Sequence, residues 1–305
     1  MARPFRFAVQ ALDLTDRNTV VAEARQAEAL GYAEFYSYDH LGAPDPFVPL
    51  VVAAEATSSL RVGPLVVNNE FHHPVLLART AASVDRMTGG RLVLGVGTGY
   101  AQNEHDAMGI ELRAPGPRIQ RFEESLVALR SLLDTGSAEM NGRHHHLSID
   151  DLGIRPHQAR VPILVGGHGR RVIEAAAPVA DIVQFTGLTH AADGTPRPGG
   201  FGIDMVTERA HWLTDAAGDR DGLIERSILV QATHLGVGAE EASDRAAARL
   251  GVTHEVVEST PFLLFGSVEQ IVDKLESLRE AVGVSHIVVR DAERFAPVVT
   301  ALAAR

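Results

Sequence analysis

Eight short apolar runs alternate along this chain with segments whose apolar residues recur at helical spacing. This alternation constrains the fold more than any other feature, because parallel strands need a crossover, usually a helix, between them. Runs that are apolar almost throughout are typical of strands buried on both faces. We therefore predict an α/β fold, a closed (β/α)8 TIM barrel, with a doubly wound open sheet as the alternative. The expected strands are 5–12, 34–39, 61–68, 92–97, 162–165, 181–186, 227–233 and 286–290.

We expect residues 1–305 to form one barrel domain with insertions at its C-terminal face. The insertions fall near 137–160, 188–202 and 253–265, where the strand–helix alternation is interrupted. The segment 188–202 is rich in Gly, Pro, Thr and Asp, which is typical of a mobile loop. Long loops at a barrel mouth often act as lids.

The composition argues against several classes of function. The net charge of −11 disfavours nucleic acid and anionic membranes as partners. The chain has no cysteine, which excludes disulfides, thiolate nucleophiles and cysteine-ligated metals. No run approaches the roughly 18 apolar residues that indicate a membrane span, and the first residues lack an apolar signal region. We therefore expect a cytoplasmic enzyme that acts on a small molecule.

Ligands of such barrels bind where the strands end, so the residues that follow each strand are the candidate site. The second strand ends in Asp39-His40, a carboxylate and an imidazole that can hold a polar cofactor group and move a proton near neutral pH. A capped turn with a structural histidine explains this pair equally well. Beyond the third strand, His72-His73 before Pro74 favours a turn into a helix over a metal site.

Glycine recurs at the end of the fourth strand, in Gly95-Val96-Gly97-Thr98-Gly99-Tyr100. Glycines at alternate positions leave one face of a strand without side chains, so that a flat ring can approach the backbone closely. A packing requirement inside the barrel is the alternative explanation.

The fifth strand ends in Gly166-Gly167-His168-Gly169, and Arg170-Arg171 open the next helix. Free N–H groups, absent Cβ atoms and two arginines would together form a cradle for a phosphate. Glycine-rich turns also occur for geometry alone. The run His144–His146 is expected to be a solvated loop, and we predict no metal site.

Taken in order, these motifs resemble the luciferase-like family, which includes FMN-dependent monooxygenases and coenzyme F420-dependent reductases and dehydrogenases. The resemblance covers almost the whole chain. It is carried by Ala24–Gly31, Tyr38-Asp39-His40, Arg61-Val62-Gly63, His73-Pro74, Gly89-Gly90-Arg91, Leu94–Gly99 and Pro162–Gly167.

Among the branches of the family, this chain resembles the F420 enzymes most. By that resemblance Asp39 and His40 lie beside the deazaflavin ring, and Asn103 bonds its polar edge. Leu65 and Val66 occupy the position where the family often has a non-proline cis peptide, which bulges against one face of the ring. The phosphate of the cofactor tail then lies at Gly166–Gly169. The full set of implied cofactor contacts is Asp39, His40, Leu65, Val66, Asn68, Gly97, Thr98, Gly99, Asn103, Gly166, Gly167, His168 and Gly169.

The resemblance implies hydride transfer between C5 of F420 and an unidentified small organic substrate, within a homodimer. His40 is the first candidate for the catalytic proton donor or acceptor, and Tyr100 is the second. Tyr100 replaces the acidic residue of the family's glucose-6-phosphate dehydrogenases, and Lys274 is the only lysine, so a sugar phosphate is not expected.

Three other functions are kept as alternatives. The first is an FMN-dependent monooxygenase supplied with reduced flavin by a partner reductase. The second is a flavin-binding barrel without turnover. A metal-dependent hydrolase is the most distant.

Overall fold

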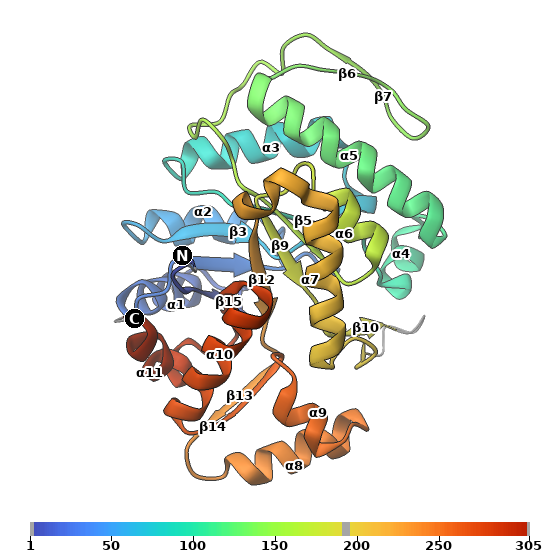
Figure 1. Ribbon diagram of the computed structural model, residues 1–305. Helices are drawn as coiled ribbons and strands as arrows, with labels where there is room; N and C mark the ends of the chain where they lie inside the picture. The colour runs from blue at the N-terminus through green and yellow to red at the C-terminus, as the bar shows by residue number, and fades with distance from the viewer. Residues whose placement is uncertain (1–2, 191–195, 304–305) are drawn as a thin grey trace.

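The computed structural model describes residues 3–190 and 196–303 (Figure 1). Its main sheet contains only parallel pairs, in the order β3-β2-β1-β15-β12-β9-β8-β5-β4. The two ends of this order approach each other through the bridge Val62–Leu92, so the sheet forms a nearly closed barrel. The predicted (β/α)8 barrel is thereby confirmed. Its strands are β1 Arg6–Gln10, β2 Glu34–Ser37, β3 Arg61–Pro64, β4 Val67–Asn68, β5 Leu94–Gly97, β8 Ile163–Gly167, β9 Ile182–Phe185, β12 Glu225–Leu229 and β15 Val284–Val289.

The third expected strand, 61–68, is divided in two. The peptide bond between Leu65 and Val66 is cis, as the family resemblance implies, and it lies between β3 and β4. β3 pairs with β2, whereas β4 pairs with β5.

Helices surround the barrel and begin at the residue types that favour helix starts. Asp16 caps the first helix by accepting a hydrogen bond from the Thr19 N–H, and Pro74 opens α3. Ser267 and Gln270 form a capping box at the start of α10. No helix in the described ranges is long and apolar enough to cross a membrane. The helices are α1 Arg17–Ala29, α2 Val48–Glu55, α3 Pro74–Met87, α4 Gln102–Met108, α5 Pro115–Thr135, α6 Arg170–Ala176, α7 Ile203–Ala217, α8 Ala239–Leu250, α9 His254–Ser259, α10 Val268–Val282 and α11 Ala292–Ala303, with short 3-10 turns at Asn69–Phe71 and Gly218–Leu223.

The interior of the barrel is layered, because every second residue of a strand points inward. At the amino ends lies a charged layer in which His286 Nε2 is 2.6 Å from Glu34 Oε2, and Arg6 is 3.2 Å from Glu34 Oε1. At the carboxyl ends lie polar side chains such as Gln10 and Arg290. An apolar layer separates the two, and its buried members are Ala8, Tyr36, Leu65, Val93, Leu164, Ile182 and Val288.

The expected insertions differ in position. Residues 137–160 contain an antiparallel hairpin, β6 Ala138–Asn141 and β7 His146–Ile149, at the top of Figure 1. The hairpin follows α5 and precedes β8, so it lies where strands begin and not at the expected C-terminal face. The sequence did not distinguish a strand-to-helix connection from a helix-to-strand connection here.

The other two insertions follow carboxyl ends of strands, as expected. Segment 188–202 comes after β9 and contains the pair β10 Thr189–His190 and β11 Pro196–Arg197, although 191–195 are outside the described residues. Segment 253–265 belongs to a larger outgrowth at the bottom of Figure 1. There β13 Ala232–Leu235 pairs in parallel with β14 Leu263–Gly266, beside α8 and α9.

Candidate active site

Asp39 connects the ends of two neighbouring strands. Its Oδ2 accepts a hydrogen bond from the Asn68 backbone N–H at 2.9 Å, and it lies 3.3 Å from His72 Nε2. The side chain of Asn68 continues this network, with Nδ2 3.0 Å from Nε2 of the fully buried His105. Because Nδ1 of His105 lies 3.1 Å from the Ile110 carbonyl, we assign the proton to Nδ1, which leaves Nε2 to accept from Asn68. The carboxylate of Asp39 is thus held in a fixed position beside the barrel mouth.

His40 lies at the centre of a second chain of polar contacts. Its Nδ1 is 2.7 Å from Glu104 Oε1 on α4, and its Nε2 is 3.2 Å from the Tyr100 hydroxyl. The rings of His40 and Tyr100 meet edge to face, with centroids 5.8 Å apart. The structure therefore brings the two expected catalytic residues together and adds a carboxylate behind them.

The protonation of this chain follows from its surroundings. Partial burial, and then the negative charge of Glu104, raises the pKa of Tyr100, while the Arg290 guanidinium acts in the opposite direction. The phenol therefore carries its proton at neutral pH and can donate it to Nε2 of His40. The Nδ1 proton of the imidazole then faces the Glu104 carboxylate, which holds the ring in one orientation.

The glycines of β5 are explained largely by packing. A Cβ on Gly97 would lie 2.6 Å from Cγ2 of Val66, and one on Gly95 would lie 2.0 Å from the Pro64 carbonyl oxygen. Gly99 has a φ of +75°, and a Cβ there would lie 2.1 Å from Asn68 Oδ1. The face that was expected to be bare is therefore covered by the chain around Val66, and a flat ring would contact that segment before it could reach β5.

The turn after β8 differs from the expected cradle in its arginines. Arg170 pairs with Glu174 at 2.8 Å, and Arg171 lies 4.0 Å from Glu123, so both arginines already face carboxylates. The buried Arg209 instead fixes this loop through hydrogen bonds to the carbonyls of His168, Thr186 and Gly200.

The glycines of the same turn differ from one another. A Cβ on Gly167 would lie 2.6 Å from Cγ1 of Val172, and Gly166 lies against Val66. A Cβ on Gly169 would meet nothing within 4 Å, so there is open space at this point of the turn.

The structure brings most of the sequence-predicted residues together at the ends of β2, β4, β5 and β8. Thr98 is half-buried at the same mouth, whereas Asn103 is exposed on α4. Sequence reasoning missed the roles of Glu104 and His105. Glu104 directly follows Asn103, which was expected to contact the cofactor. Helix α4 was not predicted, however, so the direction of the Glu104 side chain could not be inferred.

The histidine run 144–146 was expected to be solvated, and this is wrong for His145. That side chain is 4% exposed, lies 3.0 Å from the Ser125 hydroxyl, and anchors the β6–β7 hairpin on α5. In the described part of the chain no three His, Asp or Glu side chains are grouped as they would be to hold a metal ion.

Comparison with known proteins agrees with this architecture. The chain is 27% identical over 297 residues to 4-hydroxyprotoasukamycin monooxygenase of Streptomyces nodosus subsp. asukaensis, covering 85% of this chain and 76% of the relative. It is 25% identical over 315 residues to 5,10-methylenetetrahydromethanopterin reductase of Methanopyrus kandleri, covering 90% and 89%. An F420-dependent secondary alcohol dehydrogenase, solved with an F420–acetone adduct, has the same fold, with a TM-score of 0.78 and 16% identity over 98% of this chain and 99% of that one.

The family itself is shown by the match to a family model. The model of the luciferase-like monooxygenase family matches residues 3–195, which include β1 to β9 and every residue of the two polar networks described above. This chain therefore belongs to the luciferase-like monooxygenase family.

Proposed function

We propose that this protein is an F420-dependent oxidoreductase that transfers a hydride between C5 of the deazaflavin and an unidentified small organic substrate. The observation that carries the proposal is the chain Tyr100–His40–Glu104 at the barrel mouth. When bound, the deazaflavin supplies a carbon centre that accepts or donates a hydride, so the protein has to supply binding, orientation and a proton.

The residues at the mouth fit such a cofactor. Val66 forms the surface against which the ring would lie, with Asp39 and Asn68 at its edge. The open space at Gly169, beside the exposed His168, leaves room for the phosphate of the tail. In this arrangement the ring-holding groups and the proton-carrying groups come from the same strand ends.

Reduction of a carbonyl needs a proton at the oxygen in addition to the hydride at the carbon. The Tyr100 phenol donates that proton to the substrate oxygen, and Nε2 of His40, after it takes up a proton from solvent, returns one to the phenolate. The Glu104 carboxylate accepts from Nδ1 of His40 and so keeps Nε2 directed at the phenol. Oxidation of an alcohol follows the same steps in reverse.

The relatives support both this proposal and its alternative. A relative that is a 5,10-methylenetetrahydromethanopterin reductase and a neighbour in fold that is an F420-dependent alcohol dehydrogenase favour hydride transfer. A relative that is a monooxygenase favours the alternative, an FMN-dependent monooxygenase that needs a partner flavin reductase. The polar chain favours the first, because it provides a proton route for a carbonyl or carbinol.

The test is a titration of the purified protein with F420 and with FMN in parallel, each oxidised and reduced, followed by fluorescence. We expect F420 to bind at least tenfold more tightly than FMN. Anaerobic turnover with reduced F420 should continue, whereas a monooxygenase must stop without oxygen. Preference for FMN together with oxygen-dependent turnover would overturn the proposal, and unchanged activity in a His40→Gln, Tyr100→Phe double variant would contradict the proton route.

A further inference from the structure

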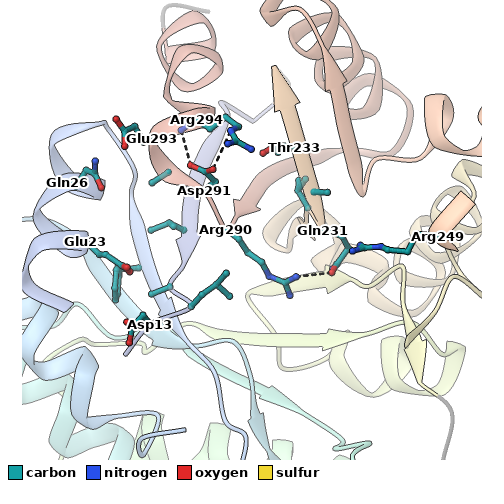
Figure 2. A pocket seen from close by; sticks show the side chains of 17 residues that line it. Asp13, Glu23, Gln26, Gln231, Thr233, Arg249, Arg290, Asp291, Glu293 and Arg294 are labelled. Atoms are coloured by element: carbon teal, nitrogen blue, oxygen red, sulfur yellow. Dashed lines mark hydrogen bonds and ion pairs between the residues drawn. The ribbon is translucent and has the colours of Figure 1, made fainter. Parts of the chain in front are cut away.

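A cavity of about 700 Å³ opens beside the candidate active site, where β1, β12 and β15 end (Figure 2). Its floor is apolar and includes Val9, Phe35 and Val230. Its walls are strongly polar, and Figure 2 shows both separated charges and the adjacent pair Asp291–Arg294. Asp13 and Glu23 come from the β1–α1 side, whereas Arg290 and Arg249 lie on the side of β15 and α8.

The two arginines lack charged partners. Nε of Arg290 donates to Gln10 Oε1 at 3.0 Å, and Nη1 donates to Gln231 Oε1 at 3.1 Å, so both acceptors are neutral amides. The exposed Arg249 extends from α8 toward Gln231 in Figure 2. Among residues 3–190 and 196–303, neither guanidinium has a carboxylate within 4.0 Å. Both arginines line this part of the cavity.

Two of the four acidic residues that line the cavity are occupied locally. Oδ1 of Asp13 accepts hydrogen bonds from both the N–H and the hydroxyl of Thr15. Asp291 accepts from the Arg294 N–H at the start of α11, and its carboxylate lies 3.5 Å from the Arg294 guanidinium. Glu23 and Glu293 also line the cavity, but within the described residues neither forms an ion pair with Arg290 or Arg249, so an anionic group would find two cationic donors and an amide on that side.

Arg290 also reaches the polar layer at the barrel mouth. Gln10, which accepts from Arg290, donates to the Leu65 carbonyl at 3.0 Å, so the arginine is positioned through the segment with the cis peptide. The Arg290 charge also acts on the Tyr100 hydroxyl.

We propose that this cavity binds the carboxylate of a small organic acid, with Arg290 and Arg249 as its ligands and the apolar floor beneath its hydrocarbon part. The cavity is separate from the Asp39 and His40 networks, none of whose residues line it. The site does not depend on the proposed function, because it needs no flavin.

The experiment measures binding to the protein without flavin, by calorimetry, with hexanoate, hexan-1-ol and inorganic phosphate as probes. We expect hexanoate to bind at least tenfold more tightly than hexan-1-ol, because only the carboxylate uses the arginines. Arg290→Gln and Arg249→Gln should each weaken hexanoate binding at least tenfold. Arg294→Gln is the matched control, since that guanidinium already faces Asp291, and it should change binding less than twofold.

Three results would overturn the inference: equal affinity for hexanoate and hexan-1-ol, tighter binding of phosphate than of hexanoate, or an equal loss in the Arg294 control. Arg249 has an exposed side chain on a surface helix, so its variant tests the site even if Arg290→Gln fails to fold. Because F420 is absent from this experiment, its outcome is independent of the flavin titration. Hexanoate binding with no F420 binding would refute the proposed function alone.

Discussion

Nδ1 of His40 lies 2.7 Å from Oε1 of Glu104, although the two residues are 64 positions apart in the chain. The contact fixes the imidazole so that its other nitrogen faces the Tyr100 hydroxyl. The carboxylate behind the imidazole accepts from Nδ1, and the phenol in front of it extends the hydrogen-bonded chain to the Tyr100 oxygen. The two contacts lead to separate predictions.

Replacement of Tyr100 by Phe removes the hydroxyl that we place nearest the substrate oxygen. We expect kcat for carbonyl reduction to fall about 10²- to 10⁴-fold, with the Kd for F420 changed less than threefold. Stopped-flow measurement of F420 oxidation checks this. Tyr38→Phe is the matched control, because Tyr38 also packs beside His40 but donates its hydroxyl proton to the Leu12 carbonyl. An equal loss in both variants would show that the effect is structural.

Replacement of Glu104 by Gln keeps an oxygen for the His40 N–H but removes the charge. We expect kcat to fall about tenfold while KM stays within twofold, because Glu104 positions and stabilises the imidazole and does not contact substrate. Glu104→Asp should recover part of kcat. A rise in KM with unchanged kcat would mean that Glu104 acts in substrate binding instead.

Gly97 and Gly169 should respond differently to replacement by alanine. Gly97→Ala places a methyl group 2.6 Å from Cγ2 of Val66, so we expect a loss of about 1–3 kcal/mol of unfolding free energy. Gly169→Ala meets open space, and the loss should stay below about 0.5 kcal/mol. Urea unfolding of both variants checks this, and similar losses would contradict the assignment. Because Gly169 faces the proposed phosphate site, its variant should still bind F420 more weakly.

Burial lowers the pKa of His145 to about 4, and the nearby positive charge of Arg121 adds to the effect. The unfolded chain has the higher pKa, about 6.5, and so binds the proton first as the pH falls. The stability that the neutral His145 side chain contributes to the folded chain is therefore lost as the pH falls from about 6.5 to about 4. In the His145→Gln variant, the decrease in unfolding free energy over this pH range should be smaller by about 1–3 kcal/mol. Thermal melts across that range measure the decrease. The exposed His146 provides the control variant, in which the pH dependence should remain.

Lys274 gives the same sign of pH dependence as His145, in an alkaline window. Burial lowers its pKa to about 8, and its Nζ donates to the Leu263 carbonyl at 3.0 Å. Above about pH 8 the folded chain releases the proton while the unfolded chain keeps it to about pH 10.5, so stability should increase across this window. Lys274→Met should lack this increase, which we expect to be about 2 kcal/mol. Urea unfolding at pH 7 and pH 10 checks the difference.

The sequence predicted the barrel because its strands are apolar almost throughout, and it indicated the candidate site because Asp39, Asn68 and Gly99 lie at or just beyond strand ends. It did not predict the division of 61–68, since the pairing of β3 with β2 and of β4 with β5 depends on closure of the sheet. It missed Glu104 because α4 is short and polar. Arg290 was recognised only as the end of a strand, because a cavity formed by three separated segments leaves no local pattern.

The apolar layer across the barrel has a consequence for catalysis. It separates the charged pair Glu34–His286 at one end from Arg290 and Tyr100 at the other. The hydrogen bonds from His286 through Ser227 run no further than Gln184, and the Tyr36 hydroxyl within the layer has no hydrogen-bond partner among the described residues. The protons that the reaction uses or releases should then travel through the open mouth. We therefore expect bound substrate to block proton exchange between the site residues and bulk water. Each catalytic cycle then uses the protons that are already on the site residues when the substrate fills the mouth.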